Sequence, residues 1–156
     1  MKTRLFTVLL TLASAFAAPA LAEQNPLVGA WERVSQTNDA GVANPQPYML
    51  VIFSEDGVFT MVNIAKGRPK TPKPVGELTP QEFRSRFTGV QAVYGTYTVV
   101  GNRLTRNVVG ALNPNNEGQQ LSDLFRIEGD TLVGWDPATK AESRLKRIRN
   151  GTLAAR

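Results

Sequence analysis

The side chains that could carry out acid–base, nucleophilic or metal chemistry in this chain are few in kind. Its 156 residues contain neither histidine nor cysteine. A Ser-His-Asp triad, a thiolate nucleophile and an ordinary zinc site are therefore excluded, because each needs one of those side chains. We expect no metal and no cofactor, and the chemistry that remains belongs to carboxylates, tyrosines and arginines.

The carboxylates are not spaced as a general acid and base. Asp123 and Glu128 share an expected strand but lie five positions apart, so their side chains face opposite sides of it. One enzymatic alternative stays open, in which Asp123 acts with Tyr94 or Tyr97 as a cofactor-free isomerase or cyclase in a closed pocket. No catalytic motif supports that alternative, and we expect a protein that is not an enzyme.

Aromatic side chains on several expected strands, together with a few polar side chains, indicate another kind of site. This is a mostly apolar pocket in which hydrogen bonds orient the ligand. A small barrel either fills with side chains or holds one small ligand. Gly95, Gly110 and Gly134 within strands favour a hollow, although strand glycines also mark bulges and corners. From the alternation of each strand we expect the wall of a ligand site to consist of Trp31, Leu50, Ile52, Phe59, Met61, Tyr97, Asn107, Phe125 and Trp135.

Eight β-strands are expected to position these side chains. Alternating runs flank Gly101-Asn102 and again Gly129-Asp130, and each pair is typical of a two-residue hairpin turn. The expected strands cover about 29–36, 47–54, 58–64, 93–100, 103–110, 120–128, 131–136 and 142–149. Eight strands joined in order by short connections predict an all-β fold, an antiparallel up-and-down barrel.

The connection between the third and fourth strands contains a basic loop and a helix. Residues 66–74 hold three prolines and four cations, which excludes a sheet interior. This loop is either a flap for an anionic partner or, as charge runs usually are, a solvated loop. Thr79 and Glu82 then predict a capping box that opens a helix of about ten residues, with Phe83 and Phe87 on one face against an end or flank of the sheet.

The first 22 residues have the pattern of a cleaved signal peptide. Lys2 and Arg4 precede an apolar run over residues 5–16, and Ala20-Leu21-Ala22 is a small-x-small cleavage site. The alternative is an N-terminal membrane anchor. Cleavage would leave a domain over 23–149 and a flexible C-terminal tail over 150–156. Export predicts a periplasmic or secreted protein, and the lack of cysteine means that it has no disulfides.

The mature chain would be only mildly basic, with 16 cations against 13 carboxylates. That balance is not typical of nucleic-acid binding, and we expect no nucleic-acid partner, no transmembrane segment in the mature chain, and a monomer or weak dimer. The expected partner is a small apolar ligand. A third hypothesis is an envelope interaction module that uses the loop at 66–73 and a basic face over residues 144–149.

Several short motifs, in order, resemble the bacterial lipocalin-like domain family. They are Leu27-Val28-Gly29-Ala30-Trp31, Tyr94-Gly95-Thr96-Tyr97, Asn113-Pro114 and Gly129-Asp130-Thr131-Leu132, and together they span about residues 27–149. The resemblance implies an eight-stranded lipocalin-like barrel that binds a small molecule. It also implies that Trp31, two residues after Gly29, packs under an arginine of the last strand and closes the barrel. Arg144, Arg147 and Arg149 are candidates, and Arg147 is preferred.

The chain departs from the family pattern at two places. Relatives often have a histidine where this sequence has Thr105-Arg106-Asn107, and an arginine where it has Asp123. If those positions line the family's cavity, the ligand of this protein differs from theirs.

Overall fold

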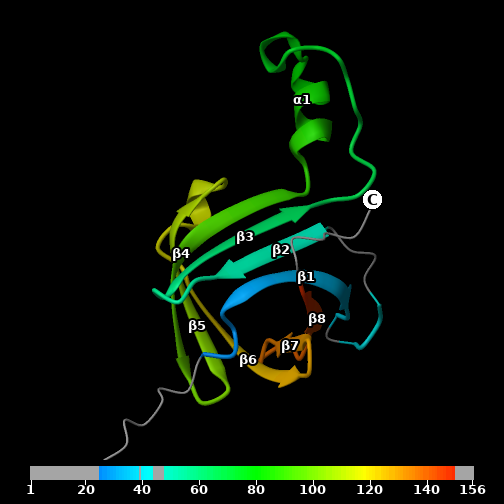
Figure 1. The fold of residues 1–156 in the computed structure, drawn as a ribbon. Coiled ribbons are helices and arrows are strands. Elements are labelled where there is room, and N and C mark those ends of the chain that lie inside the picture. The colour runs from blue at the N-terminus through cyan, green and yellow to red at the C-terminus, as the bar shows by residue number, and fades with distance from the viewer. Residues whose placement is uncertain (1–24, 39, 44–47, 150–156) are drawn as a thin grey trace, which may run out of the picture.

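Eight antiparallel strands close into one barrel in the computed structural model (Figure 1). The structure describes residues 25–38, 40–43 and 48–149, so the predicted signal peptide and C-terminal tail lie outside the described residues. Each strand pairs with the next, and β8 pairs with β1 to complete the circle. The predicted up-and-down barrel is confirmed. Its strands are β1 (Gly29–Gln36), β2 (Tyr48–Phe53), β3 (Val58–Ile64), β4 (Val90–Val100), β5 (Arg103–Ala111), β6 (Gln120–Glu128), β7 (Thr131–Trp135) and β8 (Glu142–Arg147).

Two-residue turns set the register of the longest hairpins. Gly101 has a φ of +59°, a backbone conformation that favours glycine, and it joins β4 to β5 together with Asn102. This turn pairs Val100 with Arg103, and the ladder then brings Tyr97 opposite Arg106. Side chains of directly opposed residues share one face of a sheet. Tyr97 and Arg106 therefore both face the barrel interior.

The helix α1 (Pro80–Phe87) lies between β3 and β4, as predicted, and follows a short 3-10 helix, η1 (Val75–Glu77). The capping box is present: the Glu82 amide donates to Thr79 Oγ1 at 3.2 Å, and the Thr79 amide donates to Glu82 Oε2 at 2.8 Å. No helix among the described residues is long and apolar enough to cross a membrane.

The expectation that α1 packs against the sheet is wrong. Figure 1 shows the helix standing away from the barrel, and none of its residues is buried. Its two phenylalanines, Phe83 and Phe87, stack on each other with ring centroids 4.5 Å apart. The apolar edge is therefore partly covered within the helix itself, and the barrel does not need the helix to complete its core.

The core lies inside the barrel and takes side chains from all eight strands. Its buried members are Leu27, Trp31, Val51, Phe53, Phe59, Met61, Val93, Tyr97, Leu104, Val108, Phe125, Leu132 and Leu145.

A short 3-10 helix, η2 (Pro114–Asn116), precedes β6.

One end of the barrel is closed around Trp31, which is completely buried. Its indole Nε1 donates to the carbonyl of Leu27 at 2.7 Å, and the Arg147 guanidinium lies 4.0 Å from its ring centroid. Arg147 also donates to the carbonyls of Val28 at 2.6 Å and Pro26 at 2.7 Å. A Cβ at Gly29 would lie 2.8 Å from Arg147 Nη1, so a larger residue there would displace the arginine.

Candidate functional site

A cavity of about 380 Å³ occupies the half of the barrel opposite the Trp31 end. All eight strands contribute to its walls. Many of the lining residues are the last residues of β1, β3 and β7 or the first residues of β2, β4 and β8, which lie at one end of an antiparallel barrel. The cavity reaches the loop over residues 136–141 and the strand ends from which the α1 connection leaves. The lining residues are Arg33, Gln36, Met49, Val51, Phe53, Met61, Asn63, Gln91, Leu104, Arg106, Leu121, Asp123, Phe125, Leu132, Gly134, Trp135, Asp136, Thr139, Ala141, Ser143 and Leu145.

The inner wall of the cavity is apolar. Phe53, Leu104, Phe125, Leu132 and Leu145 are each 3–6 % exposed, and all of them also belong to the core. The cavity is thus continuous with the packed half of the barrel. The barrel is neither fully hollow nor fully filled, because large side chains fill one end and space remains at the other.

A band of polar side chains lies in the wall of the cavity and includes a charged guanidinium on β1. Arg33 Nη1 donates to Gln36 Oε1 at 2.8 Å, and Nη2 donates to Asn63 Oδ1 at 3.0 Å. Asn63 in turn donates to Gln91 Oε1 at 3.1 Å. Burial lowers the pKa of Arg33, yet the guanidinium stays protonated at neutral pH because the ordinary pKa of arginine lies far above neutrality. The cavity therefore contains a positive charge held in place by amides.

A second guanidinium, Arg106 on β5, is paired with Asp123 on β6. Arg106 Nη2 donates to Asp123 Oδ2, and the side chains of the two residues are 13 % and 28 % exposed. The rest of the guanidinium lies among apolar groups, with Met61 Sδ 3.9 Å from Nη1 and the Phe59 ring centroid 5.9 Å from Cζ. Arg106 Nε is buried and has no acceptor among the described residues. This donor is out of reach of solvent, so it is an unsatisfied polar group within the wall of the barrel.

The residues predicted to form the wall fall into three groups. Met61, Phe125 and Trp135 line the cavity, although the Trp135 ring also lies under Arg126, 5.3 Å from its Cζ. Trp31, Phe59 and Tyr97 are buried in the core and do not line the cavity; Trp31 and Tyr97 belong to the closed end.

The prediction is wrong for Leu50, Ile52 and Asn107. On β2 the cavity is lined by Met49, Val51 and Phe53, and Ile52 on the other face is 40 % exposed. The strand is apolar at every position, so its sequence does not show which face is inside. Asn107 points outward and accepts a hydrogen bond from Gln120 Nε2 at 2.9 Å.

The tyrosines are not available for chemistry with Asp123. The Tyr97 hydroxyl donates to the carbonyl of Ser54 at 2.7 Å and accepts from Asn25 Nδ2 at 3.1 Å, and its burial raises the pKa of Tyr97. Tyr94 is 55 % exposed, and its ring lies over Gly110 on the outside of the barrel. The arrangement needed for a tyrosine–carboxylate acid and base is therefore not assembled.

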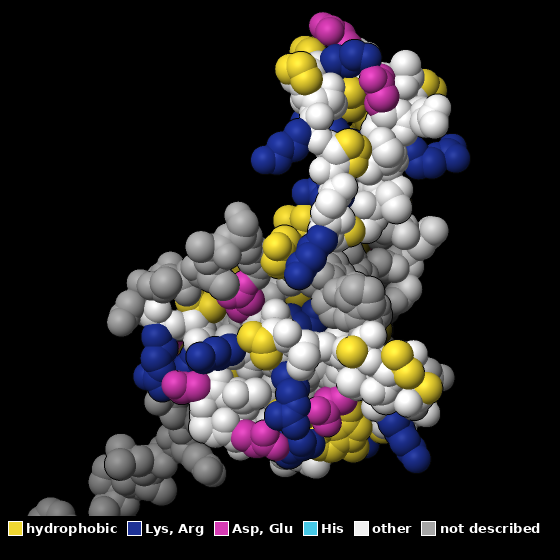
Figure 2. Space-filling model, turned by 90° about the vertical axis from the view of Figure 1, so that its right-hand side faces the viewer, with side chains coloured by type: hydrophobic (Ala, Val, Ile, Leu, Met, Phe, Trp, Pro, Cys, Tyr) yellow, Lys and Arg dark blue, Asp and Glu magenta, His cyan; other side chains and the backbone are white. Residues whose placement is uncertain are grey.

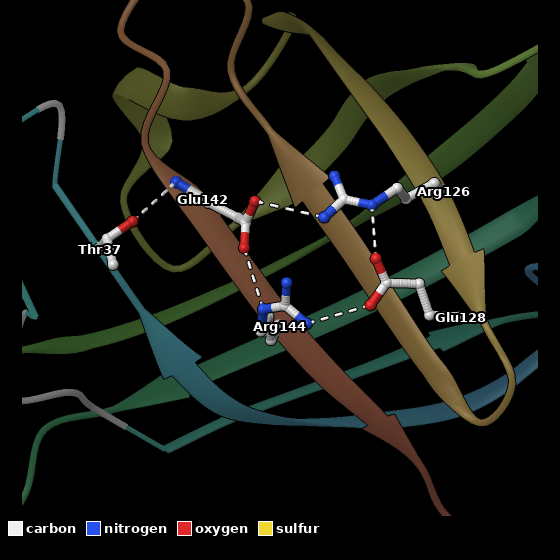
Figure 3. A network of polar contacts seen from close by, with 5 residues as sticks. All are labelled: Thr37, Arg126, Glu128, Glu142 and Arg144. Carbon is white, nitrogen blue, oxygen red and sulfur yellow. Dashed lines mark hydrogen bonds and ion pairs between the residues drawn. The ribbon is translucent and has the colours of Figure 1, made fainter. Parts of the chain in front are cut away.

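The arginines of the last strand are occupied by structural contacts. Figure 3 shows Arg126 and Arg144 alternating with Glu128 and Glu142 across β6 and β8. Arg144 Nη1 lies 3.1 Å from Glu128 Oε2 and its Nε 3.0 Å from Glu142 Oε1, while Arg126 Nε lies 2.7 Å from Glu128 Oε1. Hydrogen bonds from Arg126 and Arg144 lower the pKa of Glu128, so its carboxylate stays ionised within the network.

This network covers Val133 on β7, which is paired with both Arg126 and Arg144. Val133 faces the outer surface of the barrel, and the network above it leaves it completely buried. Arg149 is bound to Asp130, and Arg147 is held at the closed end by Trp31. Two of the four cations of the predicted basic face over residues 144–149 are therefore paired with carboxylates, and a third is held at the closed end.

Comparison with solved structures places the fold in a known class. A lipocalin-like protein from Bacteroides uniformis matches with a TM-score of 0.52 and 14 % identity, over 78 % of this chain and 98 % of that one. An uncharacterized protein from Bacteroides eggerthii matches with a TM-score of 0.51 and 9 % identity, over 78 % of this chain and 99 % of that one. No family model matches the chain, and no curated protein does.

The fold is therefore a lipocalin-like β-barrel, as the resemblance of the sequence motifs implied. Such a barrel is compatible with the binding of a small ligand.

Proposed function

We propose that this is an exported binding protein that takes a small, mostly apolar molecule reversibly into the barrel cavity. The observation that carries the proposal is the cavity of about 380 Å³ with its apolar inner wall, inside a barrel that is otherwise tightly packed. A volume of this size falls within the range of pockets that bind small molecules. The pattern of a signal peptide in the first 22 residues supports action in the periplasm or outside the cell.

The polar band favours a ligand with one polar end. An apolar body would contact Phe53, Phe125 and Leu132. A polar end would hydrogen-bond with the side-chain amides of Asn63 and Gln91 in the wall. Such a hydrogen bond supplies orientation, because a ligand bound in reverse would leave its own polar group among apolar side chains.

Binding without catalysis is the better supported activity. The interior carboxylate of Asp123 is engaged by Arg106, and Tyr94 lies outside the barrel. No described pair of groups is placed as a general acid and base. We therefore propose that the ligand leaves chemically unchanged.

The test combines native mass spectrometry with one substitution that fills the cavity. The protein is purified from its own host and examined for a retained small molecule, and then titrated with the apolar fluorophore N-phenyl-1-naphthylamine. Gly134 faces the cavity, and a Cβ there would have Leu124 O as its nearest neighbour at 3.9 Å, so Gly134→Leu places a side chain in the empty space. We expect saturable binding to the wild type and its loss in Gly134→Leu.

The matched control is Thr98→Leu, which adds the same kind of side chain at an exposed position of β4. This variant is expected to bind the fluorophore as the wild type does. Absence of both a retained ligand and saturable dye binding in the wild type would refute the proposal, as would equal binding by the two folded variants.

A further inference from the structure

The connection between β3 and β4 forms a separate projection, residues 65–89, which we call the arm. Its two ends meet where the Ala65 amide donates to the carbonyl of Gly89 at 2.8 Å. Figure 1 shows the arm leaving the barrel at this point, with α1 at its far part. Asn63 and Gln91, which flank the arm, both line the cavity. The arm therefore starts at the rim of the cavity.

The arm carries most of the net charge of the protein. It contains six cations and two carboxylates, a net +4 out of +5 for the whole chain. The remaining residues from Glu23 onward have ten cations and eleven carboxylates, which sum to −1. Figure 2 shows basic side chains projecting on both sides of the arm. Positive charge is thus concentrated on a segment that contributes no residue to the barrel core.

One of the two carboxylates of the arm is already paired with a cation of the arm. Glu82 is committed to the arm's own structure, since it caps α1 and lies 2.7 Å from Lys73 Nζ. These contacts lower the pKa of Glu82 to about 2, so it stays ionised and paired at neutral pH. Lys66, Lys70 and Arg84 remain exposed to solvent.

The arm is a folded structure that presents a cationic hollow. Arg68 Nη1 donates to the carbonyl of Arg86 at 3.1 Å, which joins the basic loop to α1. A hollow of about 510 Å³ between them is lined by Arg68, Pro69, Lys70, Thr71, Arg86 and Phe87. Three of the six lining residues are cations and none is acidic, so the hollow suits a phosphate group.

Exposed apolar side chains accompany these cations. Val75 is 50 % exposed and Phe83 is 47 % exposed, and no residue of the arm is buried. Cations that draw a surface close, next to apolar side chains that can enter it, are typical of segments that lie on anionic bilayers. A nucleic acid would account for the charge but not for the exposed apolar groups.

We propose that the arm docks the protein on the anionic surface of a phospholipid bilayer. Cationic groups along both sides of the arm contact the lipid phosphates, and Phe83 and Val75 enter the interfacial region. Docking in this way holds the rim of the cavity near the membrane. The inference concerns the surface of the arm and does not depend on what the barrel binds.

The test is co-sedimentation of the purified mature protein with vesicles of two compositions. One is an equimolar mixture of phosphatidylglycerol and phosphatidylcholine, and the other is phosphatidylcholine alone. We expect binding to the anionic vesicles, weak or no binding to the neutral ones, and release as salt is raised. The double variant K70E/R84E reverses two exposed charges of the arm and is expected to lower the partition coefficient by at least about tenfold.

The matched control is R103E/K146E, which makes the same change of net charge at exposed positions of the barrel, on β5 and β8. Thermal unfolding verifies that both variants fold. The expected result is near wild-type binding by the control and loss of binding by the arm variant. Equal losses in the two variants would overturn the proposal, because overall charge would then explain the binding. Failure of the wild type to sediment with anionic vesicles would overturn it as well.

Discussion

The pair formed by Arg106 and Asp123 should be among the most sensitive polar contacts in the protein. Replacing Asp123 with asparagine preserves the size of the side chain and removes its charge. The Arg106 guanidinium is then left 13 % exposed, between the Phe59 ring and Met61 and without its carboxylate. A charge in such surroundings without a counter-charge is strongly destabilising, since the neutral amide oxygen of asparagine replaces neither the carboxylate nor the lost water in full.

The magnitude follows from the burial of the two side chains. Breaking a fully buried ion pair by removing one partner costs about 3–5 kcal/mol. The Asp123 side chain is 28 % exposed, so some solvent reaches the pair. We therefore expect Asp123→Asn to lower the free energy of unfolding by about 2–3 kcal/mol. The double variant R106M/D123L removes both charges and should stay within about 1–2 kcal/mol of the wild type, because no uncompensated charge remains.

Urea unfolding followed by tryptophan fluorescence measures these free energies. The matched control is Glu128→Gln on the same strand, whose partner Arg126 is 44 % exposed and whose own side chain is 43 % exposed. Solvent screens that pair, so the control should change stability much less than Asp123→Asn does. If Asp123→Asn and Glu128→Gln had the same small effect, or if the double variant were less stable than Asp123→Asn, the reasoning would be refuted.

Three further outcomes are expected from the barrel. Trp31→Ala empties a fully buried site and should cost about 3–5 kcal/mol in urea unfolding. Gly95→Ala should greatly reduce the folded yield, because its Cβ would lie 1.9 Å from Asn107 O, whereas Gly134→Ala, with 3.9 Å to its nearest atom, should be tolerated in the same assay. Burial raises the pKa of Tyr97, so the unfolded chain ionises first above about pH 10; the unfolding free energy of the wild type should then fall with rising pH more steeply than that of Tyr97→Phe.

Features encoded by local chemistry were predictable from the sequence. The Gly101-Asn102 turn and the capping box of Thr79 and Glu82 depend only on neighbouring residues, and both are present in the structure. Because short connections join successive strands, the order of the strands also follows from the sequence. Their number then predicts closure of the barrel.

Alternation of apolar and polar residues could not predict which side chains of β2 point into the barrel. Its residues from Met49 to Phe53 are all apolar, and both choices of inner face give a buried apolar row. Only pairing with β1 and β3 decides the choice, since it places Val51 opposite Trp31 and Met61. A shift of one position reverses every side chain of a strand, which explains why Leu50 and Ile52 were both misplaced.

The interior position of Arg106 could have been predicted from the turn before it. A two-residue turn at Gly101-Asn102 makes Arg106 the partner of Tyr97, so one inward residue implies the other. Asn107, which the predicted wall included, follows Arg106 directly and therefore lies on the other face of β5. Asp123 on the next strand compensates the charge of Arg106, and that contact is between strands and has no local pattern in the sequence.

The seal at the Trp31 end also constrains the order in which the molecule can assemble. Arg147 contacts the carbonyls of Pro26 and Val28, which are 121 and 119 positions earlier in the chain. A polypeptide whose N-terminus emerges first has therefore formed nearly all of its sheet before it can complete this contact. Until β8 arrives, β1 keeps an unpaired edge that can associate with other chains. Contacts over such long separations also slow folding, so this edge should be the point at which a newly emerging chain most needs protection.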